Sequence, residues 1–200
     1  PTSFTKAFQR FHGVSPREAR NQNVVLKVVP KMQISERHEY SWKIEQKDDF
    51  RLVGKSTIVS CENNLHFRKI PEFWNECQRN GIFAKLISID TASPKGIFGL
   101  FGAYDEQLNE IEYSIMAISD QEPPQGFTEI NIPSAAWAIF DCRGSVPQAI
   151  QKGWQYLNEE WLVKYPFRHA QCPELEWYSN GNVYDSSYLS QIWIPIIEEE

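Results

Sequence analysis

The sequence predicts an α+β fold, in which an antiparallel sheet carries two helices on one face and a ligand groove on the other. Three observations lead to this fold class. Each half of residues 50–197 reads as strand, helix, strand, strand, with an extra strand opening the second half. One helix per half against several strands favours an antiparallel sheet with both helices on one side. A stretch rich in proline and glycine, residues 122–126, separates the two halves.

The first half is predicted to contain one helix and three strands. The strands cover 50–61, 97–104 and 111–119, and a turn at 105–109 joins the last two. The helix covers 67–80, because apolar residues recur on one helical face and Asn80-Gly81 ends the pattern. That face contains Phe67, Ile70, Trp74 and Cys77.

The second half repeats this order. A long helix is expected over 146–163, and strands over 127–132, 135–143, 175–178 and 189–196. Side chains alternate between the faces of a strand, so Ile192, Ile194 and Ile196 share one face, which we assign to the helices. Glu176 and Tyr178 are assigned to the opposite, open face, where a carboxylate costs less than in the helix-packed core.

Composition and charge exclude several classes of protein. Aromatic residues make up 14% of the chain, which fits either a ring-rich core or a ligand cavity walled by rings. The net charge is −6, whereas a self-sufficient DNA-binding chain is usually basic. The four cysteines lie far apart and no histidine pair has metal-ligand spacing, so we expect no metal or cofactor and reduced thiols in the cytoplasm. No apolar run reaches the roughly 20 residues that span a membrane.

The first 21 residues are predicted to form two short helices. Phe4, Phe8 and Phe11 share one helical face, Gly13 ends that helix, and Ser15-Pro16 begins the next. A short helix needs a partner for its apolar face, so we expect that the partner domain is missing from this sequence. The stretch resembles the end of the AraC-family helix-turn-helix domain, whose pattern F-x-x-x-F-x-x-x-x-G-x-S-P-x-x-x-R it matches from Phe4 to Arg20.

This resemblance implies a remnant of a DNA-binding domain over residues 1–21, followed by a connector over 22–49 that holds at most one strand. In the intact protein, four side chains would face DNA or its phosphates. They are Thr5, Lys6, Gln9 and Arg10. Without the rest of that domain, we expect that the remnant does not bind a specific DNA sequence.

The main domain resembles the gyrase-inhibitor-like effector-binding domain of AraC-type regulators, and the resemblance runs over about residues 40–197. The matching segments are F-R-L-V-G-K-S from Phe50, I-P-E-F-W from Ile70, L-E-W-Y from Leu175 and I-W-I-P-I from Ile192. The resemblance implies two pseudo-symmetric units with a ligand groove between them. It also implies that Glu176 is the pocket glutamate of that family, while Gln191 replaces a second acidic residue and leaves the charge of the ligand open.

Ligand-binding residues are expected on the open face of the sheet. Glu176 and Gln191 would supply polar contacts there, and aromatic rings in the strands would form the walls. The helix residues Trp74, Trp154 and Trp161 are assigned to the core, and glycines 96, 99 and 102 either thin the strand packing or leave room for a ligand. The aromatic candidates are Phe101, Tyr104, Tyr113, Trp137, Tyr178 and Trp193.

The function expected from these features is the sensing of a small-molecule effector that controls DNA binding, without catalysis. The ligand would be amphipathic or aromatic, and DNA would be contacted through the missing N-terminal domain. Two alternatives stay open: a hydrolase of the same fold with Glu176 as general base, and an inhibitor module that binds a protein. The sequence does not decide between a monomer and a homodimer.

Overall fold

A computed structural model of the chain describes residues 40–198 apart from residues 94 and 166. The predicted N-terminal helices and the expected DNA-facing residues Thr5, Lys6, Gln9 and Arg10 lie outside the described residues. Most of the expected connector lies outside them as well.

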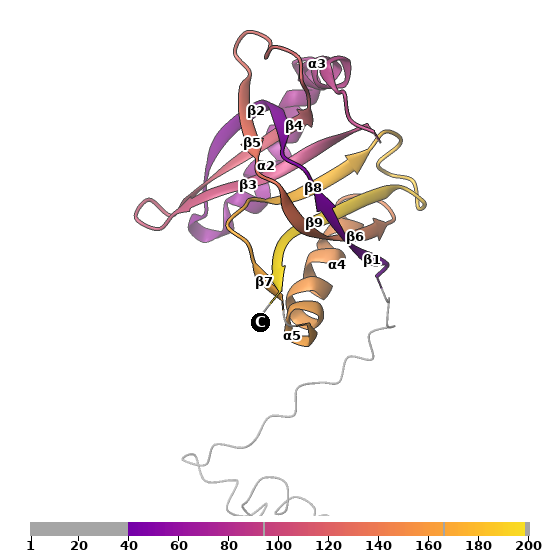
Figure 1. Ribbon diagram of the computed structural model, residues 1–200. Coiled ribbons are helices and arrows are strands. Elements are labelled where there is room, and N and C mark those ends of the chain that lie inside the picture. The colour runs from indigo at the N-terminus through magenta and orange to yellow at the C-terminus, as the bar shows by residue number, and fades with distance from the viewer. Residues whose placement is uncertain (1–39, 94, 166, 199–200) are drawn as a thin grey trace, which may run out of the picture. The chain divides into compact units, whose positions relative to one another are not determined.

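The described residues form an antiparallel sheet with helices packed against it (Figure 1). The strands lie in the order β1-β6-β9-β8-β3-β4-β2-β5, and β7 pairs with β9. Every strand pairing is antiparallel, which confirms the predicted fold class. The strands are β1 Trp42–Lys47, β2 Phe50–Ser60, β3 Gly96–Asp105, β4 Glu110–Ile118, β5 Thr128–Ile132, β6 Ala135–Arg143, β7 Phe167–His169, β8 Glu174–Ser179 and β9 Leu189–Glu198.

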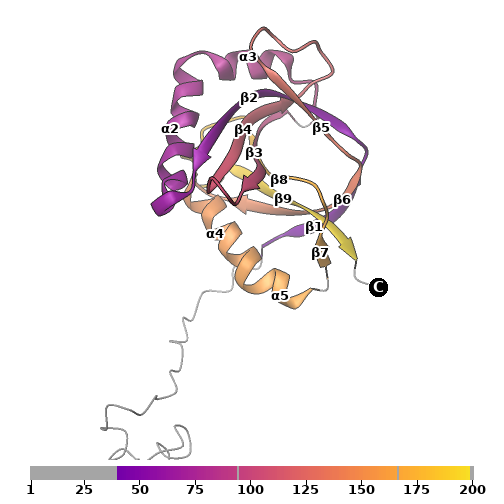
Figure 2. The same cartoon turned by 90° about the vertical axis from the view of Figure 1, so that its left-hand side faces the viewer.

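The sheet is strongly curved, and the helices lie on its outer side (Figure 2). We call this side the helix face and the concave side the inner face. The helices of the first half are α2 His66–Arg79 and α3 Ile82–Ile89, after a short 3-10 turn at Glu62–Asn64. The second half carries α4 Gln148–Tyr156, which continues through a π-helical turn at Leu157–Trp161 into α5 Leu162–Lys164.

The core consists of one hydrophobic cluster on the inner face and two on the helix face. On the helix face, Phe140, Ile192 and Trp161 belong to the cluster under α4, and Ile115 and Leu86 to the cluster under α2 and α3. Ile194 and Ile196 lie in the α4 cluster with Ile192, which confirms the predicted assignment of these three isoleucines to the helices. The inner cluster contains Leu52, Phe98, Leu100, Met116, Ile132, Trp137, Ile139, Leu175, Trp177 and Trp193.

Three elements differ from the sequence prediction. Helix α3 follows α2 directly, because Gly81 adopts a left-handed φ of 73° and turns the chain into a second helix rather than ending the helical region. The three-residue strand β7 is too short to give a periodic signal. Strand β1 belongs to the sheet through its pairing with β6, although it precedes residue 50, where the sequence analysis began the main domain.

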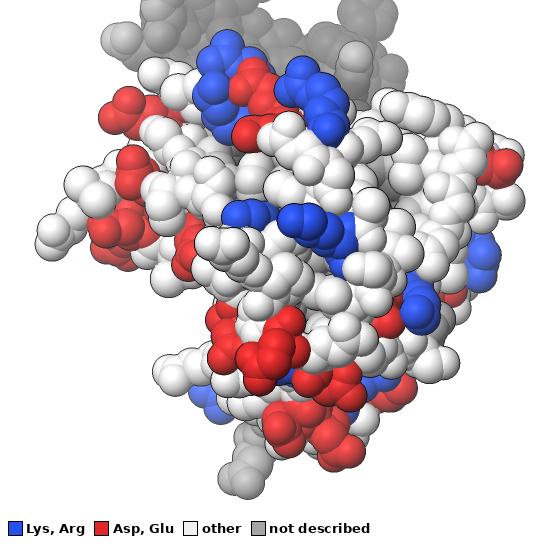
Figure 3. Space-filling model, turned by 90° about the horizontal axis from the view of Figure 1, so that it is seen from above, with Lys and Arg blue, Asp and Glu red and all other residues white. Residues whose placement is uncertain are grey.

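The surface of the described residues carries charges of both signs. On the face shown in Figure 3, acidic side chains gather in several groups and basic side chains form only small patches among them. This face therefore offers no continuous basic surface for a nucleic acid. Among the described residues, no helix is both long enough and apolar enough to cross a membrane.

Candidate functional site

Glu176 lies in β8 and points toward the helix face of the sheet. The residue is only 7% exposed. The indole Nε1 of Trp154, on α4, donates a hydrogen bond to Glu176 Oε1 at 2.6 Å, and the Tyr178 hydroxyl donates to Oε2 at 2.8 Å. The buried carboxylate is therefore matched by donors from a helix and from its own strand, as a buried acceptor requires.

Tyr113, on β4, connects the carboxylate to the helix of the other half. Its hydroxyl lies near the Glu176 carboxylate and opposes the rise in the pKa of that group. The same hydroxyl accepts a hydrogen bond from Nε1 of Trp74, on α2, at 3.0 Å. Tyr113 thus lies between the indole N–H of Trp74 on α2 and the carboxylate on β8, and brings polar groups of both halves together in a low-dielectric interior.

Aromatic rings surround Glu176. Phe101 lies edge-on to Tyr113 and to Trp154, with ring centroids 5.0 and 6.2 Å apart. Trp74 lies edge-on to Tyr178 at 4.9 Å. We call these five rings and Glu176 the glutamate site; α2, β3 and β4 from the first half and α4 and β8 from the second half build it.

Gly99 explains how a tyrosine hydroxyl and a carboxylate fit side by side beneath the helices. It lies opposite Glu176 in the pairing of β3 with β8. A Cβ at this position would lie 2.3 Å from the Tyr113 hydroxyl oxygen and 3.3 Å from Glu176 Oε2. The site therefore needs glycine here, which favours room at a polar site over simple thinning of the strand.

Burial dominates the electrostatics of the glutamate site. It raises the pKa of Glu176 above its ordinary value, although the hydrogen bonds from Trp154 and Tyr178 oppose that rise. Burial, and then the nearby Glu176 charge, hold the pKa values of Tyr113 and Tyr178 well above 10. Both tyrosines are thus neutral hydrogen-bond donors, and the carboxylate is the group that can carry charge.

The predicted placement of Glu176 and Tyr178 on the open face is wrong. Their contacts with Trp154 and Trp74 put both side chains under α4 and α2. The prediction assumed that a carboxylate avoids the helix-packed side, but the donors supplied by Trp154 and Tyr178 offset its desolvation.

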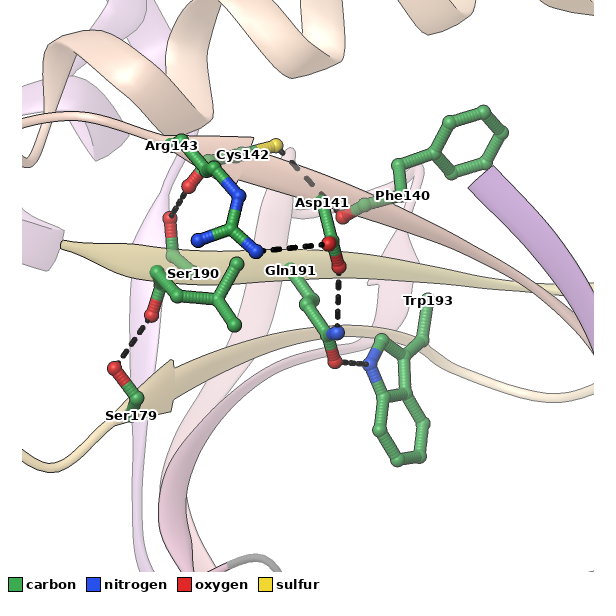
Figure 4. A network of polar contacts seen from close by, with 9 residues as sticks. Phe140, Asp141, Cys142, Arg143, Ser179, Ser190, Gln191 and Trp193 are labelled. Atoms are coloured by element: carbon green, nitrogen blue, oxygen red, sulfur yellow. Dashed lines mark hydrogen bonds and ion pairs between the residues drawn. The ribbon is translucent and has the colours of Figure 1, made fainter. Parts of the chain in front are cut away.

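Gln191 and Trp193 point to the inner face instead, away from the helix at the top of Figure 4. Trp193 Nε1 donates to Gln191 Oε1 at 2.9 Å, and Gln191 Nε2 donates to Asp141 Oδ1 at 2.8 Å. Arg143 lies 3.6 Å from the other Asp141 oxygen. The replacement of an acidic residue by Gln191 therefore does not alter the charge of the glutamate site.

The remaining predicted ligand-binding residues do not lie together in the structure. Phe101 and Tyr113 belong to the glutamate site. Trp137 is fully buried in the inner cluster, with ring centroids 6.1 Å from Trp193, and its indole N–H has no partner among the described residues. Tyr104 is 52% exposed and donates to Asn109 across the hairpin turn, so it lies apart from both groups.

The sequence analysis missed Trp74 and Trp154 as site residues. Both lie on the apolar stripes of their helices and were assigned to the core with Trp161, which is indeed fully buried there. The missed signal was the polar edge of the indole ring, because a buried indole N–H usually finds an acceptor. Trp154 and Trp74 find Glu176 and Tyr113, whereas Trp161 Nε1 has no partner among the described residues.

The glutamate site presents one buried carboxylate among aromatic rings. A buried carboxylate among aromatic faces matches a lipophilic cation, through charge pairing and cation–π attraction. Across residues 40–198, as far as they are described, no group of three or more His, Cys, Asp or Glu side chains is arranged to hold a metal ion.

Solved structures of the same fold include a ligand complex and a transcription regulator. SAV2435 bound to tetraphenylphosphonium superposes with a TM-score of 0.70 at 22% identity, covering 78% of this chain and 94% of that one. An integron cassette protein from the mobile metagenome of Vibrio cholerae gives 0.53 at 19%, covering 79% and 97%. The EcmrR C-terminal domain gives 0.56 at 16%, covering 80% and 99%, and EcmrR has also been solved in complex with DNA.

The family comparison agrees with the fold. The search of curated proteins found no match. The profile of the family Cass2, described as integron-associated effector binding protein, matches residues 43–196, which span β1 to β9. With most of its length matched, this chain belongs to the integron-associated effector binding protein family.

Proposed function

We propose that this chain is an effector-sensing domain that binds an amphipathic, aromatic cation in the glutamate site. The observation that carries the proposal is the buried Glu176 carboxylate, which aromatic residues from both halves surround and which no basic side chain neutralises among its described contacts. A ligand cation would supply the missing positive charge, and aromatic rings would contact its apolar groups.

Two further facts support a cationic ligand. The Tyr113 and Tyr178 hydroxyls stay neutral, so within the glutamate site Glu176 alone can supply the negative charge that a cation would pair with. A protein of the same fold, SAV2435, was solved with tetraphenylphosphonium, a lipophilic cation. At 22% identity this likeness shows a shared fold, and the transfer of ligand class to this chain is our inference.

Trp154 would have to move when a cation binds. In this structure its N–H donates a hydrogen bond to Glu176 Oε1 at 2.6 Å, and a ligand cation would approach that same oxygen. Trp154 lies on α4, so a ligand that displaces its ring would act directly on a helix. A ligand that favours one of two such arrangements shifts the population between them.

The proposed output is control of DNA binding by an attached domain, as the sequence analysis expects for residues 1–21. EcmrR, whose C-terminal domain shares this fold, has been solved bound to DNA. DNA contact through Thr5, Lys6, Gln9 and Arg10 remains a proposal that depends on a complete helix-turn-helix domain.

The proposed function involves no chemical reaction. The polar groups described beside the Glu176 carboxylate are two tyrosine hydroxyls and an indole N–H, and the raised tyrosine pKa values make those hydroxyls poor nucleophiles. No described serine or cysteine hydrogen-bonds to the carboxylate, so a general base at Glu176 would have no protein nucleophile to activate.

Calorimetric titration with two ions of nearly equal size tests the proposal. Tetraphenylphosphonium is expected to bind the wild-type chain, and its anionic counterpart tetraphenylborate is not expected to bind at the glutamate site. Glu176→Gln should weaken tetraphenylphosphonium about tenfold or more, because it removes the charge-assisted contact. Affinity for the cation should also fall as the pH is lowered through the raised pKa of Glu176, where the carboxyl becomes neutral.

Glu160→Gln is the matched control, because it makes the same chemical change and removes the same charge. Glu160 is exposed and makes no described contact with the site. The control variant should leave the affinity unchanged. Equal binding of tetraphenylphosphonium by wild type and Glu176→Gln would contradict the proposal, as would equal binding of the two ions by the wild type.

A further inference from the structure

The inner face of the sheet contains a cavity that is separate from the glutamate site. Its volume is about 380 Å³, within the ~300–1,000 Å³ typical of small-molecule pockets. Four aromatic residues and five charged residues contribute to its walls: Phe50, Phe98, Trp177 and Trp193, and Lys43, Glu45, Lys47, Asp48 and Asp49. The cavity therefore combines flat apolar surface with charge.

The charged side chains reach the inner face through the register of β1. In its pairing with β6, Lys43 lies opposite Ile139 and Glu45 opposite Trp137, and both partners belong to the inner cluster. Glu45 accepts from Lys43 at 2.8 Å and from Lys47 at 2.6 Å. These contacts lower the pKa of Glu45, which stays ionised, so the three groups together keep one positive charge that no carboxylate among them balances.

Lys47 occupies the position that a ligand cation would take in this cavity. Its Nζ lies 5.2 Å from the centre of the Trp193 ring, and its side chain is 30% exposed. The face of Trp193 that would attract a cation is thus already covered by a cation of the chain itself. The cavity is therefore unsuited to a second lipophilic cation.

Trp177 provides an unused hydrogen-bond donor at the cavity wall. The residue is 4% exposed, and no described residue accepts a hydrogen bond from its indole Nε1. It lies beside Phe98 and opposite Gln191 in the sheet, and the Gln191 amide is already tied to Asp141 and Trp193. This N–H is not completely buried, so solvent can reach it, and a ligand acceptor would take the place of that solvent.

We propose that this cavity binds a small planar aromatic carboxylate, with its ring among the aromatic side chains and its carboxylate between the Lys47 ammonium and the Trp177 N–H. Asp48 and Asp49, which also line the cavity, are exposed at its rim and carry the opposite charge. Because both are exposed, solvent weakens but does not remove their repulsion of a carboxylate, and this repulsion grows with the charge of the anion. This site does not depend on ligand binding at Glu176.

Titration with 2-naphthoate, and with its neutral analogue 2-naphthamide, tests the inference on the full chain. We expect 2-naphthoate to bind about tenfold more tightly than the amide. Lys47→Met keeps the length of the side chain but removes its charge, and it should abolish this preference. Lys152→Met, the same change on the exposed side of α4, should leave it intact.

A spectroscopic readout separates binding from an effect on folding. The chain has seven tryptophans, so a ¹H–¹⁵N spectrum can resolve their indole N–H signals, and Trp177→Phe identifies the Trp177 signal by its loss. That signal should shift on addition of 2-naphthoate, and Trp177→Phe should weaken binding a few-fold while keeping the ring.

Three outcomes would overturn the inference. One is equal affinity for 2-naphthoate and 2-naphthamide in the wild type. Another is a Trp177 N–H signal that does not move at saturating 2-naphthoate. The third is a loss of 2-naphthoate binding in Glu176→Gln with none in Lys47→Met, because that would place the anion on the helix face.

Discussion

Both faces of the sheet place aromatic side chains beside a charged group, but the charge is negative on the helix face and positive on the inner face. On the helix face, aromatic N–H and O–H groups of Trp154, Tyr113 and Tyr178 surround the carboxylate of Glu176. On the inner face, the Lys47 ammonium lies over the ring of Trp193. In our two proposals the charge of the ligand therefore follows from the charged group closest to the rings, Glu176 on the helix face and Lys47 on the inner face, and not from the rings themselves.

The faces also differ in how strongly solvent screens that charge. Glu176 is 7% exposed, whereas the side chain of Lys47 is 30% exposed and shares Glu45 with Lys43. An electrostatic change at the glutamate site should consequently have a larger effect than one on the inner face.

The largest effect is expected from Gly99→Ala. The added methyl group would meet the Tyr113 hydroxyl at 2.3 Å, so the tyrosine or the strand must shift. We expect a loss of about 2–3 kcal/mol in the free energy of unfolding, measured by urea denaturation, together with loss of tetraphenylphosphonium binding.

Gly102→Ala is the control on the same strand, since the nearest atoms to its added methyl group lie at 3.2 Å. Its effect should be clearly smaller. If Gly99→Ala were no more destabilising than Gly102→Ala, the close packing of Tyr113 and Glu176 against β3 would be disproved.

An intermediate effect, of opposite sign, is expected from Trp154→Phe. This change keeps an aromatic ring but removes the N–H that occupies Glu176 Oε1. Tetraphenylphosphonium should bind about tenfold more tightly, equivalent to ~1.4 kcal/mol, because it no longer competes with an internal donor.

Trp74→Phe removes an indole N–H from the same site, but that group donates to Tyr113 rather than to the carboxylate. Calorimetry should show little change for this variant. Weaker binding by Trp154→Phe would show that the indole N–H assists the ligand instead of competing with it.

The smallest effect is expected from Gln191→Glu, which tests whether the two faces are separate. The new carboxylate would face Asp141, whose Oδ1 now accepts from the Gln191 amide at 2.8 Å. We expect a loss of about 1 kcal/mol in stability at neutral pH and no change in tetraphenylphosphonium affinity.

Gln155→Glu introduces the same like-charge contact with Glu159 on the exposed surface of α4 and should cost less. Tighter tetraphenylphosphonium binding by Gln191→Glu would mean that residue 191 contributes to the cation site after all.

Periodicity was sufficient to predict the strands other than β1 and β7, the two main helices and the helix-facing isoleucines of β9. It could also group Glu176 with Tyr178, because residues two apart in a strand share a face. Periodicity could not decide which face that was. The decision depends on Trp154, Trp74 and Tyr113, which are distant in sequence and meet Glu176 and Tyr178 only in the folded chain.

The same limit explains the other errors. Gln191 and Trp193 share a face in β9, but β8 and β9 are offset so that Glu176 pairs with Ile192 rather than with Gln191. Register between strands is fixed by tertiary packing, and a single sequence carries little information on it. Strand β1 did carry a period-2 signal, because Tyr40, Trp42 and Ile44 alternate with polar residues, but the sequence analysis read this segment as part of the connector.

Glu176 and Trp177 are neighbours in β8, and this adjacency makes the alignment of one short strand decisive. A slip of β8 by a single residue would exchange the faces, placing an indole under the helices and a carboxylate beside Lys47. Two hydrogen bonds at the end of the strand hold the alignment: Ser179 Oγ donates to the Leu189 carbonyl at 2.7 Å, and the Tyr188 hydroxyl donates to the Ser179 carbonyl at 2.6 Å. The ligand preference that we propose for each face thus depends in part on two hydrogen bonds that lie outside both proposed sites.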